Sequence, residues 1–393
     1  KKNFLKAAVM TLVAGGAIFG TAMVSDAANV RILPVDTAKF WAGARFDFDV
    51  EVSGAKNPEN VKVDINGVPA DKFFGKNAVQ KTLDNGVVSY RIDQVSFPKT
   101  GDITVTASAN DNGVVSTSTA KYKVVNEKAV KRAKNVILFI GDGMSLQARE
   151  IARILSKGMT NGKYNDLLAM EKLDHNAVIT TSGYDSLVTD SANSASAYAT
   201  GHKSVVNAMG VYEDSTKDPL DDPKVENLSE ILKRTRGMSI GIITQAESTD
   251  ATLWSDIPEE GKQDFLAKSY LDDNHRPDVI MGGGSARYLP SSVPGSKRKD
   301  NDNIIQDFKD KGYTFVSNSK EMMAAPSDKP LLGLFHTGTM DVYIDREMLK
   351  NPKVLKGFTD QPNLMNMTKK SLDILSKNPN GFFAMIEGAS IDK

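Results

Sequence analysis

The stretch Val188–Gly201, VTDSANSASAYATG, contains the residues best suited to chemistry. Small residues dominate after Ser191, and Gly201 tolerates the positive φ with which helices commonly end, so the stretch predicts a tightly packed helix. Asp190 and Ser191 then lie at its start. A hydroxyl there adjoins unpaired backbone amides and the positive end of the helix dipole, where an anion such as phosphate binds. Taken alone, the stretch favours a serine that only caps the helix, because capping serines far outnumber nucleophiles.

Three apolar runs end in side chains with oxygen donors. Asp142 follows NVILFI, Asp250 and Thr252 follow MSIGII, and Glu387 and Asp392 belong to GFFAMIEGASIDK. Open parallel sheets bind ligands beyond the carboxyl ends of their strands, so these side chains are expected to meet. Carboxylate and hydroxyl oxygens suit Mg²⁺, and Asp250 would orient a bound water. Each acid singly favours a turn or cap, but three such motifs together with Ser191 favour a site.

Ser191 needs activation, because a serine hydroxyl at its ordinary pKa is a poor nucleophile. The chain has four histidines, and the sequence around Ser191 lacks the G-x-S-x-G signature, so a Ser-His-Asp hydrolase is poorly supported. Coordination of the serine oxygen to a divalent cation stabilises the alkoxide without histidine. The acids at the strand ends favour this second route.

Two kinds of element must position these residues. Apolar runs that alternate with helical stretches, from residue 135 to residue 393, predict a doubly wound α/β domain with a mostly parallel sheet. The run NVILFI shows no alternation and predicts a strand buried on both faces. Residues 28–126 instead alternate with period two and predict a small all-β immunoglobulin-like sandwich, interpreted as a weakly packed spacer or accessory module. A charged linker, residues 127–134, would join the two domains.

Composition narrows the function further. The 393 residues carry 49 basic and 49 acidic side chains, so no overall field favours nucleic acid or an anionic membrane. Residues 1–27 combine a basic start, an apolar middle and small residues at the end, which predicts a secretory signal peptide rather than a membrane anchor. The chain contains no cysteine, so disulfides and thiolate ligands are excluded. An exported protein, periplasmic or extracellular, is expected.

Four motifs in order closely resemble those of the alkaline phosphatases. They are the Asp-Ser-Ala nucleophile motif in VTDSANSASAYATG, the first strand and metal aspartate in NVILFIGDGMS, the magnesium-site segment TQAESTDAT, and the Glu-Gly-Ala-Ser-Ile-Asp-Lys motif in GFFAMIEGASIDK. The resemblance covers Asn135–Lys393 and does not extend to the N-terminal module. It implies hydrolysis of small phosphate monoesters with Mg²⁺ and Zn²⁺ as cofactors; a homodimer is left open.

The resemblance also implies a role for each matching residue. Ser191 would attack phosphorus, form a phosphoserine and act as a metal ligand. Asp142 would link the magnesium site to one zinc site, and Lys393 would reach the phosphate through water. The remaining metal ligands implied by the resemblance are Asp250, Thr252, Glu387 and Asp392.

The sequence departs from the family pattern in two ways. The family's phosphate-clamping arginine, eleven residues after the threonine that matches Thr252, is absent, and Arg149 and Lys203 are the candidates to replace it. The family's histidine and Asp-His zinc ligands come after the aspartate that matches Asp392. The sequence given stops at Lys393, so we expect an incomplete catalytic domain that binds zinc poorly and turns over slowly or not at all.

Two alternatives stay open. The missing arginine fits a phosphodiesterase or sulfatase on the same scaffold. A surface binding protein, with a ligand-binding sandwich and a catalytically inactive α/β part, would fit an incomplete site.

Overall fold

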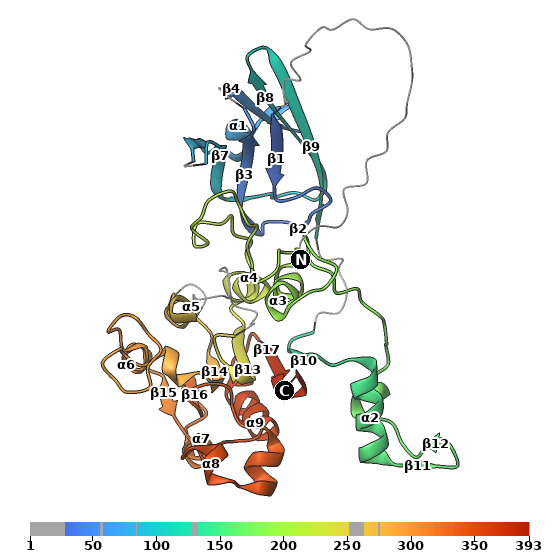
Figure 1. The fold of residues 1–393 in the computed structure, drawn as a ribbon, viewed down its shortest axis with the longest axis vertical. Helices are drawn as coiled ribbons and strands as arrows, with labels where there is room; N and C mark the ends of the chain where they lie inside the picture. The colour runs from blue at the N-terminus through green and yellow to red at the C-terminus, as the bar shows by residue number, and fades with distance from the viewer. Residues whose placement is uncertain are drawn as a thin grey trace, which may run out of the picture.

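The computed structural model describes residues 28–55, 58–83, 85–126, 133–250, 263–273 and 276–392. The predicted signal peptide, most of the predicted linker, Thr252, His275 and Lys393 lie outside these ranges. The described chain folds into an N-terminal two-sheet module and a C-terminal α/β part, with the helices α3 (Ser191–Thr200) and α4 (Leu228–Arg236) between them (Figure 1).

The N-terminal module consists of two β-sheets, and buried side chains alternate with more exposed ones along several of its strands. One sheet has the order β1-β3-β7-β6 and the other the order β2-β9-β8-β4-β5. Alternation places every second side chain of a strand on the inner face. The strands are β1 Asn29–Leu33, β2 Lys39–Trp41, β3 Arg45–Ser53, β4 Pro58–Ile65, β5 Val68–Pro69, β6 Val79–Thr82, β7 Val88–Ser96, β8 Gly101–Asp111 and β9 Val114–Val125, with the short helix α1 Ala70–Phe74.

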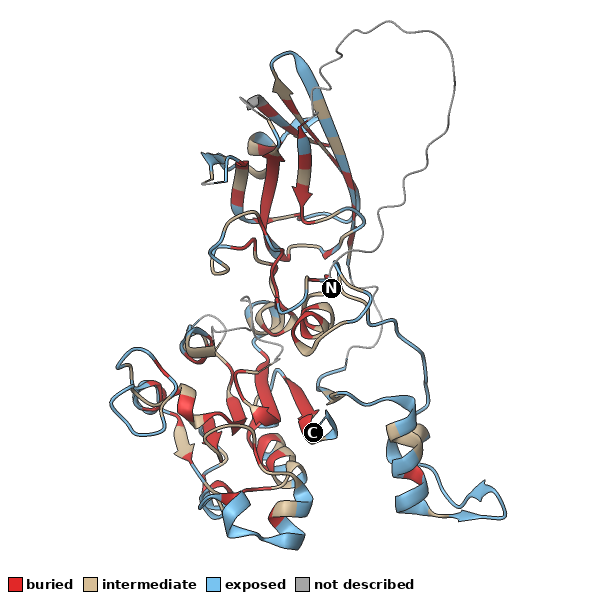
Figure 2. Ribbon diagram, viewed as in Figure 1, coloured by how far each residue is buried: buried red, intermediate tan, exposed pale blue. Residues whose placement is uncertain are grey.

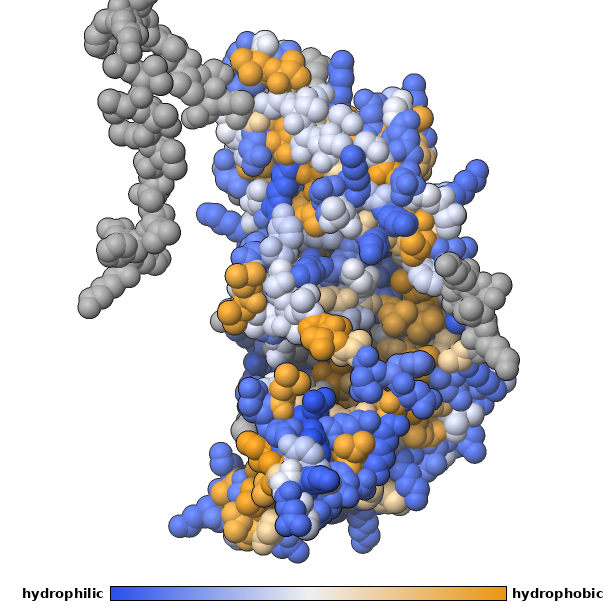
Figure 3. All heavy atoms as spheres, turned by 90° about the vertical axis from the view of Figure 1, so that its right-hand side faces the viewer, coloured by the Kyte–Doolittle hydropathy of each residue, from blue (hydrophilic) through white to orange (hydrophobic). Residues whose placement is uncertain are grey.

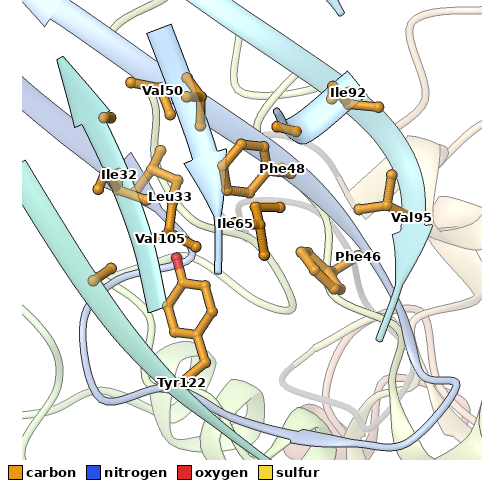
Figure 4. Packing of buried hydrophobic residues seen from close by; sticks show 14 of the residues in the cluster. Ile32, Leu33, Phe46, Phe48, Val50, Ile65, Ile92, Val95, Val105 and Tyr122 are labelled. Carbon is orange, nitrogen blue, oxygen red and sulfur yellow. The ribbon is translucent and has the colours of Figure 1, made fainter. Parts of the chain in front are cut away.

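One hydrophobic core holds the two sheets together. Phe48 and Val50 of β3 meet Ile65, Val105 and Tyr122 of the other sheet, and all five are buried (Figure 4). Burial of large apolar side chains stabilises each by about 1.5–3 kcal/mol. The two sheets therefore share a core that is distinct from the cores of the parallel sheet.

A six-stranded parallel sheet forms the centre of the α/β part. Its order is β10-β17-β13-β14-β16-β15, and each neighbouring pair is parallel. Its strands are β10 Val136–Gly141, β13 Ser239–Glu247, β14 Val279–Gly283, β15 Thr314–Val316, β16 Leu331–Leu334 and β17 Phe382–Gly388. The predicted α/β class with a mostly parallel sheet is confirmed.

Helices cover both faces of this sheet. Consecutive residues of one strand belong to different cores: Phe383 belongs to the cluster that includes residues of α6, and Ala384 to the cluster that includes residues of α9. Buried residues concentrate on the strands of this sheet (Figure 2). The helices are α2 Leu146–Lys157, α3 Ser191–Thr200, α4 Leu228–Arg236, α5 Gln263–Ser269, α6 Ile304–Asp310, α7 Ser319–Ala324, α8 Pro352–Leu355 and α9 Leu364–Leu375. Shorter elements are the hairpin β11 Met159–Thr160 with β12 Lys163–Tyr164, the 3-10 turns Ala169–Lys172, Ser285–Arg287 and Ala389–Asp392, and the π-helical turn Ile344–Leu349. Within the described ranges, each helix falls short of the length and apolar character that a bilayer crossing requires.

Strand β10 differs from its prediction. It lies at the edge of the sheet and pairs with β17, and Phe139 is 67% exposed. The prediction of a strand buried on both faces is wrong, because an uninterrupted apolar run does not reveal how many neighbours cover it. On the same side of the molecule, α2 exposes Leu155, and hydrophobic residues form separate groups among polar ones (Figure 3).

Candidate active site

Helix α3 places Ser191 at its first position. The N-cap Asp190 accepts a hydrogen bond from the Asn193 backbone N–H at 2.9 Å, and Asn193 bonds back to the Asp190 backbone N–H at 3.1 Å. This reciprocal capping satisfies two groups that would otherwise lack partners. The helix ends at Gly201, whose φ of 78° is the left-handed conformation that glycine adopts freely. The helix predicted from small residues therefore forms, with Asp190 as its cap and Ser191 just inside.

Asp142 lies beside this serine. It follows the last residue of β10, and the Ser191 hydroxyl donates a hydrogen bond to its Oδ1 at 3.4 Å. Partial burial raises the pKa of Asp142, and the negative charges of Asp392 and Asp250 raise it further. The hydrogen bonds from Ser191 and from the Gly143 backbone lower it. Asp142 is thus a carboxylate crowded by other acids.

Asp392 packs directly against the turn that follows β10. Gly143 has a φ of 62°, and a Cβ added to it would overlap the carboxylate of Asp392. A glycine is needed here because of both the backbone conformation and the space. The turn after β10 and the 3-10 turn after β17 therefore bring Asp142 and Asp392 together.

Glu387 lies deeper in the same region. It is the sixth residue of β17 and is 5% exposed. The Thr244 hydroxyl on β13 donates a hydrogen bond to its Oε2. Burial raises the pKa of Tyr198 on α3, and the charges of Glu387 and Asp142 raise it further, so both acids act on one helix. The sequence analysis missed Thr244 and Tyr198, although the position of Thr244 near the end of an apolar run was a usable signal.

The predicted residues divide into two groups. The structure places Ser191, Asp142, Asp392, Asp250 and Glu387 in one region, by contact or by electrostatic influence. Thr252 and Lys393 lie outside the described residues. Within the ranges described, no three His, Asp or Glu side chains are close enough to form a metal cluster. The acids therefore lie at the same edge of the sheet, but no three of the described ones are close enough together to surround one metal ion.

The chemistry of the described donors nevertheless fits a hard divalent cation. The charges that raise the pKa of Asp142 are carboxylates, so a cation among them would relieve their repulsion. Two of the described histidines contact other groups. His202 hydrogen-bonds to the Tyr212 hydroxyl, and His336 accepts from the Gly338 backbone. The third, His175, is exposed.

The two candidates for the missing phosphate clamp lie elsewhere. The Arg149 Nε is 3.5 Å from a carboxylate oxygen of Glu171, and Lys203 donates a hydrogen bond to the Ser182 hydroxyl at 2.7 Å. Among the contacts of the described residues, neither cation reaches Ser191 or Asp142. The structure thus gives no support to either candidate.

The fold and site define an α/β protein with a serine-bearing helix at the carboxyl edge of a parallel sheet. The family model described as Alkaline phosphatase matches residues 133–393. The chain belongs to the alkaline phosphatase family.

Known relatives agree with this assignment. Alkaline phosphatase H of Pseudomonas aeruginosa is 33% identical over 302 residues, which cover 67% of this chain and 61% of that protein. The alkaline phosphatase of Escherichia coli is 30% identical over 302 residues, with the same coverage of 67% and 61%. A crystal structure of a cold-active alkaline phosphatase from Shewanella sp. has a TM-score of 0.52 and 26% identity, and covers 66% of this chain and 57% of that one. The chain thus spans about 61% of the length of these two curated relatives.

Proposed function

We propose that the chain hydrolyses phosphate monoesters through a phosphoserine on Ser191. The hydrogen bond from the Ser191 hydroxyl to Asp142, at the start of α3, is the observation that carries the proposal. It directs the serine proton toward Asp142, which leaves an oxygen lone pair free for phosphorus. The serine oxygen forms a bond to phosphorus as the P–O bond of the ester breaks, and the leaving oxygen takes up a proton, equivalent to the one that serine gives up, and departs as the alcohol. Water then attacks the phosphoserine, which releases phosphate and restores the hydroxyl.

The acids of the site would hold the metal ions. Asp142, Glu387 and Thr252 would be ligands of a magnesium ion. Asp250 would orient a water molecule bound to that ion, and Asp392 would be a zinc ligand. Bound divalent cations supply stabilisation of the serine oxyanion and of the leaving oxygen. Lys393 would reach the phosphate through water. The support is the convergence of the described acids and membership of the family.

The first experiment compares two serines of one helix. Ser191→Ala removes the proposed nucleophile, whereas Ser194→Ala, one turn closer to the middle, removes a hydroxyl that bonds to the Asp190 carbonyl. We expect p-nitrophenyl phosphate hydrolysis to fall to background in the first variant and to persist in the second. Acid-quenched protein should carry one phosphoryl group on the peptide that contains Ser191. Equal hydrolysis by both variants would contradict the proposal.

Substrate range is a separate question, because neither Arg149 nor Lys203 contacts the serine. A site without a bidentate clamp holds the phosphate dianion less tightly and discriminates less between phosphate and sulfate esters. Rates on a monoester, a diester and a sulfate ester of p-nitrophenol, measured with and without added Zn²⁺, would separate the monoesterase from a diesterase or sulfatase. Full zinc-stimulated monoesterase activity would contradict the expectation of poor zinc binding.

The remaining assignments are also proposals. We class the two-sheet module, residues 28–126, as immunoglobulin-like because of its two packed sheets and its single core. Export to the periplasm or medium follows from the predicted signal peptide, and a homodimer stays an expectation.

A further inference from the structure

A single segment, residues 202–226, lies between the N-terminal module and the helix that carries Ser191. Its residues Tyr212 and Val225 are buried in the hydrophobic core of the module, although they follow the module by roughly ninety residues or more in the sequence. In Figure 1 the module, α3 and the parallel sheet follow one another along the long axis of the molecule. The module is therefore not a loosely attached spacer.

The module extends one of its sheets into this segment by backbone pairing. Phe46 of β3 forms an antiparallel bridge with Val225. The Asp47 N–H donates to the Lys224 carbonyl at 2.8 Å, and the Glu226 N–H donates to the Arg45 carbonyl at 2.9 Å. Backbone pairs of this kind fix register as well as distance.

The same segment then pairs with itself. The Val225 N–H donates to the Gly210 carbonyl at 2.8 Å, and the Tyr212 N–H donates to the Pro223 carbonyl at 2.9 Å. Residues 210–212 are thus held at a fixed offset from β3.

Two residues of the segment, Asn207 and Gly210, hydrogen-bond to helix α3 or to its N-cap. The Gly210 N–H donates to the Ser196 hydroxyl at 3.2 Å, and Ser196 is 3% exposed. The Asn207 N–H donates to the second carboxylate oxygen of Asp190 at 2.6 Å. Asp190 is the N-cap and directly precedes Ser191, so the second contact acts next to the proposed nucleophile.

A buried aromatic contact accompanies these backbone hydrogen bonds. The ring centroids of Phe40 on β2 and His202 are 5.0 Å apart, and His202 Nδ1 is 2.9 Å from the Tyr212 hydroxyl. Burial lowers the pKa of His202 to about 4, which favours the neutral ring. His202 comes directly after the C-cap Gly201, and this aromatic contact therefore joins the far end of α3 to the module.

We propose that the N-terminal module is a positioning element for Ser191, acting on both ends of α3 through residues 202–226. Phe40 and Tyr212 are positioning residues in this scheme, because they touch α3 only through other groups. The catalytic part of the inference rests on the proposed function. The structural part, that the module restrains α3, does not.

Hydrogen–deuterium exchange of the full chain tests the restraint from the module side. Phe40→Leu shortens the side chain that packs on His202, and Tyr212→Phe removes only the hydroxyl that bonds to it. Val105→Ala serves as the matched control, since Val105 is buried in the module core on β8, which pairs with β4 and β9, whereas the segment pairs with β3 of the other sheet. We expect amides of α3 to exchange about tenfold faster in the first two variants and at the wild-type rate in the control. Equal exchange of α3 in all three variants would overturn the inference, and Tyr212→Phe keeps the test open if Phe40→Leu does not fold.

Kinetics distinguish positioning from simple loss of folded protein. A misplaced nucleophile lowers kcat by about tenfold and leaves KM unchanged, whereas partial unfolding lowers only the amount of active enzyme. Active-site titration by phosphoserine trapping corrects for that amount. If the wild-type chain fails to hydrolyse any phosphate ester, the proposed function fails, while exchange in α3 still decides the restraint. An unchanged corrected kcat alongside faster exchange would overturn the catalytic part alone.

Discussion

The hydrogen bond from Ser191 to Asp142 joins the proposed nucleophile to a carboxylate that is itself destabilised. Burial and two neighbouring acids raise the pKa of Asp142, which means that its ionised form is less stable in the folded protein than in water. Sites that gather like charges in this way are typical of function rather than of stability. Removing the charge of Asp142 should therefore leave the stability of the fold unchanged or higher and should lower the rate of hydrolysis.

Asp142→Asn is the direct test of that statement. The amide oxygen can still accept from Ser191, but the negative charge is lost. In EDTA we expect the variant to melt at the same temperature as the wild type or higher, because the repulsion from Asp392 is relieved. Hydrolysis should fall by about a hundredfold or more, because cation binding is weakened. Thermal unfolding with and without Mg²⁺ checks the mechanism: added Mg²⁺ should raise the Tm of the wild type only, and an equal rise in the variant would count against Asp142 as a ligand.

Gly143→Ala tests how closely Asp392 must approach the turn after β10. The added methyl group would meet the Asp392 carboxylate, and the φ of 62° is unfavourable for alanine. We expect about 1–2 kcal/mol of destabilisation from the backbone alone, together with a loss of hydrolysis as Asp392 moves. Gly162→Ala is the matched control, since Gly162 also has a positive φ but has open space around it. Similar activity in the two variants would show that the position of Asp392 is unimportant.

Helix α3 begins at a cap that is hydrogen-bonded on two sides. Its first turn carries no acidic side chain other than the cap, and Asp190 accepts two backbone hydrogen bonds, from Asn193 and from Asn207. Asp190→Ala should cost about 1–2 kcal/mol, whereas Asp190→Asn should retain most of that stability. Urea unfolding measures both, and α3 should lose protection from exchange only in the alanine variant. Equal unfolding midpoints for the two variants would mean that the cap contributes little.

The elements near the site differ in how far the sequence reveals them. The helix Ser191–Thr200 and the strand Phe382–Gly388 follow from local signals: small residues between two cap residues, and an apolar run before a turn. The edge position of β10 does not, because NVILFI has the same pattern whether one neighbour or two cover it. Segment 202–226 has no periodicity, and its partners on β3 lie about 180 residues away along the chain. Pairing of that kind is specified by the assembled fold rather than by local pattern.

The candidate site was predictable in its residue types but not in its spacing. Strand ends brought Asp142 and Glu387 to one edge of the sheet, as expected for parallel strands. The distances among the acids depend on turns such as Gly141–Gly143, against which Asp392 packs. The hydrogen bond from Thr244 to Glu387 forms because β13 and β17 are neighbours, and this strand order follows from the whole sheet.

The surface between the module and segment 202–226 is unusually acidic for a buried region. Asp49 and Glu51 of β3 are 1% and 2% exposed, and Asp214 and Asp222 of the segment are also buried. Two arginines face them. Arg91 pairs with Asp47 at 3.2 Å and lies 3.6 Å from Asp214, and Arg31 pairs with Glu51 at 3.4 Å. The hydroxyl of Ser89 donates to Asp49 at 2.8 Å. The buried acids outnumber these two arginines, so protonation should matter to the assembly of the whole molecule.

The pH dependence of unfolding follows from the sign of these shifts. Burial raises the pKa of Asp49 to about 7, with a further rise from Glu51 and Asp214, and burial also raises the pKa of Asp222 to about 7. The unfolded chain titrates near the ordinary value, so the folded state binds more protons between about pH 4 and pH 7. The free energy of unfolding therefore falls as pH rises through that window and levels off above it, by at most about 4 kcal/mol for Asp49.

Asp49→Asn isolates this effect from other titrations. The amide keeps an oxygen that can accept from Ser89 but has no charge to desolvate, so we expect a higher Tm than the wild type at pH 8 and a much smaller difference at pH 5. Asp102→Asn, at an exposed position on β8, is the control and should leave the difference between pH 5 and pH 8 unchanged. If the Asp49 charge weakens the contact between the module and segment 202–226, the amides of α3 should also exchange more slowly in Asp49→Asn at pH 8. The reason is that the module without this charge holds the segment more firmly. A Tm for Asp49→Asn that falls between pH 5 and pH 8 as steeply as that of the wild type would show that Asp49 does not control the assembly.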